Sequence, residues 1–163
     1  AAAVGLNWTF APMVDISRDP RWGRVMEGAG EDPYLGSKIA EARVKGFQGN
    51  DLSSNKTIAA CAKHFAAYAF AESGRDYNTV DVSEATLQNI IFPPFKACVD
   101  ADVKTFMNSF NTLNGVPATG NAYLQRDILK LHLTLKLAHQ LMNSNLDLNL
   151  IMPEKLHLLE QKQ

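Results

Sequence analysis

Three apolar runs alternate along this chain with stretches of helical periodicity, and this alternation constrains the fold more than any other feature. The runs cover residues 8–16, 57–62 and 104–110. Apolar residues recur at helical spacing after each run. Parallel strands need a crossover connection, which is usually a helix. The sequence therefore predicts an α/β domain built on a parallel sheet.

Capping residues mark where the helices begin and end. Asp32 precedes Pro33, whose missing N–H is tolerated in a first turn, and the apolar spacing continues to Gly49. Residues 81–84 (DVSE) have the spacing of a capping box for a second helix, which Pro93 and Pro94 must kink or divide. Asn121 is placed to cap a third helix through residue 129.

Composition changes near residue 130. Every aromatic residue lies at or before Tyr123 and every glycine at or before Gly120, whereas the last 38 residues hold twelve leucines and three of the four histidines. From residue 131 leucine alternates with polar residues, and no turn residue separates the runs. We expect one domain over residues 1–130 and a divergent tail over residues 131–163.

Charge and cysteine content exclude several classes of protein. With 16 basic and 17 acidic residues there is no basic footprint for nucleic acid. No apolar run reaches the roughly 18 residues of a membrane span, and the first residues lack a signal-peptide pattern. Cys61 and Cys98 are expected to be buried and reduced. His132, His139 and His157 lack acidic or cysteine partners at ligand spacing, so no metal or cofactor is expected.

Polar residues follow each apolar run. Residues 18–24 hold arginines after the first run, Lys63 and His64 follow the second, and Asn108 and Asn111 end the third. In parallel α/β folds, binding groups gather where strands end and loops begin. The three groups are therefore expected to lie together at one edge of the sheet and to form a ligand site.

Each of these groups has a structural alternative. The arginines beside Asp19 and Glu27 suit a loop-stabilising network of ion pairs, although a guanidinium fork also grips hydroxyls or a carboxylate. The asparagines also suit a turn that needs no ligand. Lys63 beside His64 favours ligand binding, because a half-buried cation next to an imidazole is costly unless both find partners.

Several motifs follow one another along residues 1–130. They are GLNWTFAPMVDISRDPRWGR (residues 5–24), EGAGEDP (27–33), KHF (63–65), ESGRDYNTVD (72–81), PPFK (93–96), FN (110–111) and NGVP (114–117). In this order they resemble the N-terminal domain of family 3 glycoside hydrolases, and in particular its periplasmic β-glucosidase group. The resemblance implies an α/β fold of the TIM type, a partial (β/α)8 barrel with about three βα units.

The resemblance also implies roles for single residues. In the family, the residues matching Arg24, Lys63 and His64 hydrogen-bond hydroxyls of the sugar whose glycosidic bond is cleaved. Such contacts strengthen as the sugar ring flattens in the transition state. Phe110 stands where many members carry tyrosine, so that stacking on the sugar remains and a hydroxyl contact is lost.

Residues Arg75 and Asp76 lie in the loop after Lys63 and His64, and the resemblance places them at a neighbouring subsite. The family branch that cleaves N-acetylglucosaminides carries a His-Asp pair in this loop, and this chain has no histidine there. The expected substrates are therefore β-linked glucosides, xylosides or oligosaccharides. The family is commonly exported, which implies a periplasmic or secreted protein.

Two carboxyl groups that a retaining glycosidase needs have no match here. The family's nucleophile lies on a strand about a dozen residues beyond the position of Leu129, where this chain has the leucine-rich tail, and its acid/base glutamate lies in a later domain. We expect a partial chain whose tail arises from truncation, a frameshift or a mispredicted reading frame, and no turnover in isolation. The alternative is a non-catalytic remnant, or a weak carbohydrate-binding or interaction module.

Overall fold

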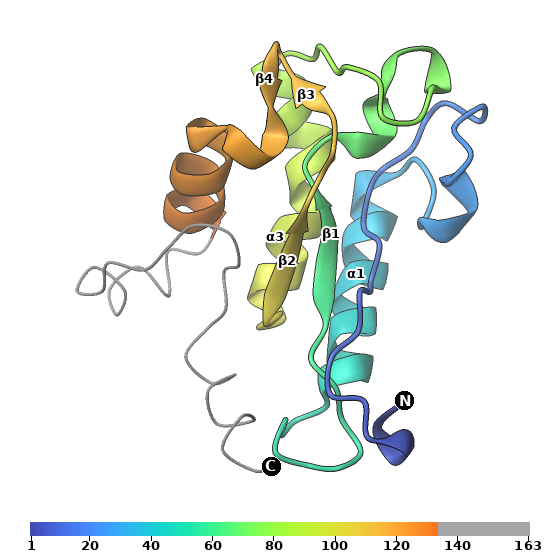
Figure 1. The fold of residues 1–163 in the computed structure, drawn as a ribbon, viewed down its shortest axis with the longest axis vertical. Helices are drawn as coiled ribbons and strands as arrows, with labels where there is room; N and C mark the ends of the chain where they lie inside the picture. The colour runs from blue at the N-terminus through green and yellow to red at the C-terminus, as the bar shows by residue number, and fades with distance from the viewer. Residues whose placement is uncertain (134–163) are drawn as a thin grey trace.

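The structure, a computed structural model, describes residues 1–133 (Figure 1). Short 3₁₀ turns, at Val25–Glu27, Tyr68–Phe70 and Glu72–Gly74 among others, link the main elements. In chain order those elements are α1 (Pro33–Gln48), β1 (Cys61–Phe65), α2 (Glu84–Thr86), a π-helical turn (Leu87–Ile91), α3 (Phe92–Asp100), β2 (Thr105–Asn108), β3 (Thr112–Leu113), β4 (Val116–Pro117) and a π-helical segment (Tyr123–Leu133).

A parallel sheet forms the centre of the molecule, as the sequence predicts. β1 pairs in parallel with β2, and the first apolar run lies along the other side of β1 (Figure 1). That run is not the continuous strand predicted for residues 8–16. It makes two isolated parallel bridges, Trp8 with Ala59 and Met13 with Lys63. Pro12 lies between them and has no N–H to donate to a ladder.

β1 differs from the predicted strand at residues 57–62. It begins at Cys61 and ends at Phe65, because the N–H of Ile58 donates instead to the carbonyl of Phe47 at the end of α1. Lys63 and His64 therefore lie inside the strand and not in the loop after it. The ladder with β2 slips between Lys63 and Phe65, which is the irregularity of a β-bulge. The slip leaves the N–H of His64 outside the ladder.

The helix caps confirm most of the sequence analysis. Asp32 Oδ1 accepts the N–H groups of Tyr34 and Leu35, at 2.7 and 3.3 Å, and so starts α1 at Pro33. The capping box at residues 81–84 is wrong: Ser83 is the cap residue, and its hydroxyl accepts the N–H of Thr86 at 3.2 Å. Pro93 and Pro94 follow directly after the π-helical turn Leu87–Ile91, which separates α2 from α3, so the helical stretch is divided there as predicted.

Asn121 caps the last described helix through its side-chain oxygen, which accepts the N–H of Leu124 at 3.2 Å. This helix is π-helical and continues through Leu133, past the predicted boundary at residue 130, which remains a prediction. Residues 134–163, with His139 and His157, lie outside the described part of the chain, as does the side chain of His132.

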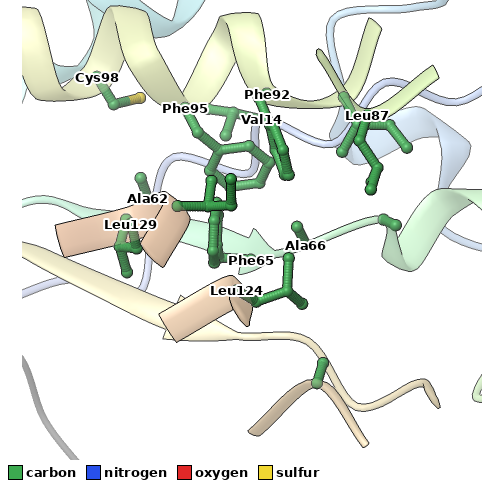
Figure 2. Packing of buried hydrophobic residues seen from close by; sticks show 14 of the residues in the cluster. Val14, Ala62, Phe65, Ala66, Leu87, Phe92, Phe95, Cys98, Leu124 and Leu129 are labelled. Atoms are coloured by element: carbon green, nitrogen blue, oxygen red, sulfur yellow. The ribbon is translucent and has the colours of Figure 1, made fainter. Parts of the chain in front are cut away.

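Phe65 occupies the middle of the main hydrophobic core. It is fully buried and packs against Phe92 and Phe95 of α3, with ring centroids 5.8 and 5.1 Å apart. Figure 2 shows Phe65 between α3 and the segment that carries Leu124 and Leu129. Both cysteines are buried and unpaired, as predicted.

Gln48 joins the last turn of α1 to both strands. Its amide nitrogen donates to the carbonyl of Asp102 at 2.8 Å, and its oxygen accepts the N–H groups of Ala60 and Lys104 at 3.3 and 3.0 Å. The side chain is buried, so water cannot replace it. Gln48 therefore satisfies three backbone groups at the start of the sheet.

We predict that Gln48→Ala lowers the free energy of unfolding by about 2–4 kcal/mol, because it leaves those backbone groups unsatisfied in the core. Urea denaturation of the 163-residue chain measures the change. Gln88→Ala is the matched control, since Gln88 is exposed and its amide nitrogen donates to the side chain of the exposed Glu84. Equal losses in the two variants would show that Gln48 does not tie the sheet to α1.

Candidate functional site

A cluster of charged and aromatic residues gathers where β1 ends, and it brings together the three residues to which the sequence analysis gives most weight. Arg24 comes from the loop after the first apolar run, and Lys63 and His64 come from β1. Glu27 and Tyr68 complete the cluster from the two neighbouring turns. We call these five residues, with Asp15, the His64 cluster.

His64 is held by Asp15. One carboxylate oxygen, Asp15 Oδ2, lies 2.9 Å from the ring nitrogen Nδ1 and 2.9 Å from the backbone nitrogen of His64. Both side chains are only 2% exposed. The bulge in β1 frees the backbone N–H for this contact. The pair thus anchors the first apolar run to β1 at the point where the site begins.

Arg24 contacts the opposite nitrogen of the same ring. Its Nη1 lies 3.3 Å from His64 Nε2, while Nε and Nη2 donate to the two carboxylate oxygens of Glu27 at 2.6 and 2.9 Å. The hydrogen bonds from Arg24 lower the pKa of Glu27 more than burial raises it, and the charge of Lys63 adds to the lowering. This bidentate pair fixes the plane of the guanidinium.

The ion-pair alternative is therefore partly confirmed. Arg24 pairs with Glu27, and Arg21 pairs with Asp19 at 2.7 Å in the same loop. Arg21 and Asp19 both belong to this loop, and the Arg21 side chain is exposed. The pair of Arg24 and Glu27, in contrast, lies against the ring of His64. Both arginines thus have an acidic partner, but of the two only Arg24 also contacts His64.

Lys63 carries a positive charge without a hydrogen-bonded partner among the described residues. Its side chain is half-buried, and its backbone is fixed by hydrogen bonds with Pro12 and Val14. Its charge acts on Glu27 across the cluster. A lysine held by its backbone and left free at its ammonium is available to an added ligand.

Aromatic rings border the cluster. The ring of Tyr68 is fully buried and stands edge-on to His64 at 4.9 Å, with the guanidinium of Arg24 5.6 Å from its centroid. Phe110 lies 6.3 Å from His64 and 5.6 Å from Tyr77, and it is 59% exposed. An exposed ring beside hydrogen-bonding groups is suited to stacking on a ligand.

Asp76 reaches the cluster, and Arg75 does not. The indole N–H of Trp22 donates to Asp76 Oδ1 at 2.9 Å. Burial raises the pKa of Asp76, but the hydroxyl of Tyr68, the indole of Trp22, the charge of Arg24 and the backbone N–H of Tyr77 together lower it by more. Arg75 is exposed, and its guanidinium has no hydrogen-bond or ion-pair partner among the described residues. The loop that carries both residues approaches the arginine loop closely at Gly74 (φ 65°), where a Cβ would lie 3.0 Å from the backbone nitrogen of Trp22.

Buried oxygen atoms without partners lie at the same end of the sheet. Among the described residues they include Asn111 Oδ1 and Ser17 Oγ. Burial raises the pKa of the Tyr68 phenol, and the nearby Asp76 raises it further. Asn111 directs its amide nitrogen to the carbonyl of Thr112, as the turn interpretation expects, while Asn108 lies in β2 opposite Phe65.

Sequence reasoning missed Asp15, Glu27, Trp22 and Tyr68 as members of the site. Asp15 is the one charged residue in an otherwise apolar run, and a buried carboxylate at a strand end is a signal that was available. Nothing in the spacing of the aromatic residues identifies Trp22 and Tyr68, because they meet only through the folding of two loops.

The described residues contain neither a metal-binding group of side chains nor a helix that could span a membrane. No group of three or more histidine, cysteine or acidic side chains is arranged to hold a metal ion there. Likewise, no helix in that part of the chain has the length and apolar content to cross a membrane.

The sequence matches a family model, "Glycosyl hydrolase family 3 N terminal domain", over residues 1–136. The chain belongs to this family. A periplasmic β-glucosidase of Salmonella typhimurium is 50% identical over 130 residues, and an exo-1,4-β-xylosidase of Emericella nidulans is 45% identical over 129 residues. These matches cover 80% and 77% of this chain.

Solved structures agree with the family 3 assignment. A mutant β-glucosidase from Listeria innocua in complex with laminaribiose is 47% identical and superposes with a TM-score of 0.79 over 81% of this chain. The match covers 19% of that protein, and the two curated relatives are covered over 17% and 16% of their length. This family 3 chain therefore corresponds to less than a fifth of each of these relatives.

We predict that Trp22→Phe raises the pKa of Asp76 toward its ordinary value of 3.8, because it removes the indole donor and keeps a ring against Tyr68. An Asp whose pKa is lowered by folding stabilises the protein above pH 3.8, and that stabilisation is lost as the pH falls through the lowered value. The variant should therefore lose less stability on acidification. Carboxyl carbon NMR measures the pKa, and Trp8→Phe, which removes a different indole hydrogen bond, should leave it unchanged.

Proposed function

We propose that this chain supplies sugar-binding residues of a β-glucosidase-type glycoside hydrolase that acts on β-linked glucosides or xylosides and their oligosaccharides. The observation that carries the proposal is that Arg24, from the loop after the first apolar run, meets Lys63 and His64 of β1 at one end of the sheet. Together they offer guanidinium and ammonium donors beside an imidazole, while sugar hydroxyls both donate and accept.

The border of the cluster suits the same class of ligand. Phe110 presents an exposed ring, and the apolar face of a pyranose stacks on such a surface. We assign Asp76, held by Trp22, and the unengaged Arg75 to a neighbouring subsite. The names of the relatives support a sugar ligand, since they are β-glucosidases and a β-xylosidase, and one structure contains laminaribiose.

The described sheet is proposed to be part of a (β/α)8 barrel. Within the described residues β2 pairs only with β1, so its outer edge is open. Open edges of parallel sheets are normally covered or closed. In this proposal residues 1–130 form about three units of the barrel and residues 131–163 are a divergent tail. The periplasmic relative supports a periplasmic or secreted location for the whole enzyme.

Catalysis is proposed to need carboxyl groups other than those of the His64 cluster. A retaining glycosidase uses two carboxyl groups about 5–5.5 Å apart, one of them as a nucleophile. Asp15 is buried and accepts two hydrogen bonds from His64, and Glu27 is paired with Arg24. Neither carboxylate is free to attack a sugar. A non-catalytic carbohydrate-binding or interaction module remains the alternative for the chain in isolation.

We predict that the 163-residue chain does not hydrolyse a chromogenic aryl β-glucoside. Release of the chromophore is measured with the wild type and with a Lys63→Ala, His64→Ala double variant. Turnover that disappears in the double variant would contradict this prediction and require a nucleophile among the carboxylates present.

Binding tests the sugar-binding role separately from catalysis. Lys63→Met is expected to weaken the affinity for methyl β-glucoside at least about tenfold, because a charge-assisted hydrogen bond is lost. Calorimetric titration measures the affinity. Lys56→Met removes an exposed lysine outside the cluster and serves as the control. Equal affinities for the two variants, or no binding by the wild type, would contradict the proposed function.

A further inference from the structure

We infer that Asp15 is a positioning residue, which holds the proton of the His64 imidazole on Nδ1 and leaves Nε2 as a hydrogen-bond acceptor. The consequence for a bound sugar rests on the proposed function, whereas the position of the proton does not. The inference follows from the contacts on the two sides of one ring.

Arg24 faces the ring nitrogen opposite Asp15. A guanidinium carries only donors, so its Nη1, 3.3 Å from His64 Nε2, forms a hydrogen bond there only when Nε2 carries a lone pair. A neutral imidazole carries one N–H, which must then be at Nδ1. An imidazolium would place an Nε2–H and a second positive charge against the guanidinium.

Asp15 receives that proton. Its Oδ2 accepts Nδ1–H and the backbone N–H of His64, both at 2.9 Å, so one atom fixes both the ring and its backbone. Because both side chains are 2% exposed, water does not compete for these contacts. The edge of the ring against Tyr68 limits its rotation further.

This arrangement gives the site a direction for hydrogen bonds. The single lone pair of Nε2 faces Arg24, so a sugar hydroxyl that meets His64 must replace Arg24 as the donor to Nε2, while its oxygen accepts from Arg24 or Lys63. A hydroxyl can do both at once, whereas fluorine can only accept. The cluster should therefore select a hydroxyl group at one position of the sugar and reject a fluorine there.

Nitrogen-15 NMR of the imidazole rings tests the position of the proton in the full 163-residue chain at neutral pH. His64→Gln identifies the His64 signals by their loss. We expect an Nδ1–H tautomer in the wild type and in Asp15→Asn, whose carbonyl oxygen can take the place of Oδ2. Asp15→Ala should lower the population of the Nδ1–H tautomer, because only the contact with Arg24 then favours it, and the control Asp81→Ala, which changes an exposed carboxylate, should leave that population unchanged.

An Nε2–H tautomer or an imidazolium in the wild type would overturn the inference, as would an unchanged tautomer in Asp15→Ala. If Asp15→Ala does not fold, the wild-type spectrum alone decides, since it shows either the expected tautomer or the other. Rescue by Asp15→Asn separates the positioning role from the charge of the carboxylate.

Deoxy and deoxyfluoro methyl β-glucosides test the direction of the hydrogen bond. At one ring position both analogues should bind about tenfold more weakly than the parent glucoside, and the penalty for fluorine should shrink in Asp15→Ala. Tolerance of fluorine at every position would overturn the inferred selection of a hydroxyl. A chain that binds no glucoside but shows the Nδ1–H tautomer would contradict the proposed function and support the positioning role of Asp15.

Discussion

The buried contact between Asp15 and His64 is the interaction on which the arrangement of the site depends. It joins the first apolar run to β1 at the place where the regular ladder slips, so that a carboxylate takes over a backbone N–H that the ladder leaves free. Breaking a buried pair of this kind leaves an uncompensated polar group, which is costly. The proposed sugar-binding site and the tertiary structure therefore share one constraint.

Around this contact two loops form a second layer. Trp22 and Tyr68 come from different loops and meet as perpendicular rings, with Asp76 bonded to the indole and Gly74 allowing the two backbones to approach. These aromatic residues are buried although they belong to loops. The loops are thereby packed against the end of the sheet, which restricts the positions that Arg24 can adopt.

Much of the fold was predictable where local chemistry decides it. Asp32 and Pro33 start α1 in the predicted place because capping depends on neighbouring residues alone. Strand limits were less predictable, since the hydrogen bond from Ile58 to Phe47 and the slip at His64 depend on segments distant in sequence. The capping-box spacing predicted that the second helix begins after Asp81, whereas in the structure its cap residue is Ser83. The spacing of residues 81–84 alone does not distinguish these two starting points.

The sequence by itself determined the family and the alternation of strands and helices that leads to a parallel sheet. It also identified Arg24, Lys63 and His64 as candidate site residues. Only the tertiary structure decided which nitrogen of His64 faces Arg24, that Asp15 is its partner, and that Arg75 stays apart while Asp76 joins Trp22. The physical reason is that residue types and caps are local properties. Hydrogen-bond direction and burial are set by groups that meet only after the chain has folded.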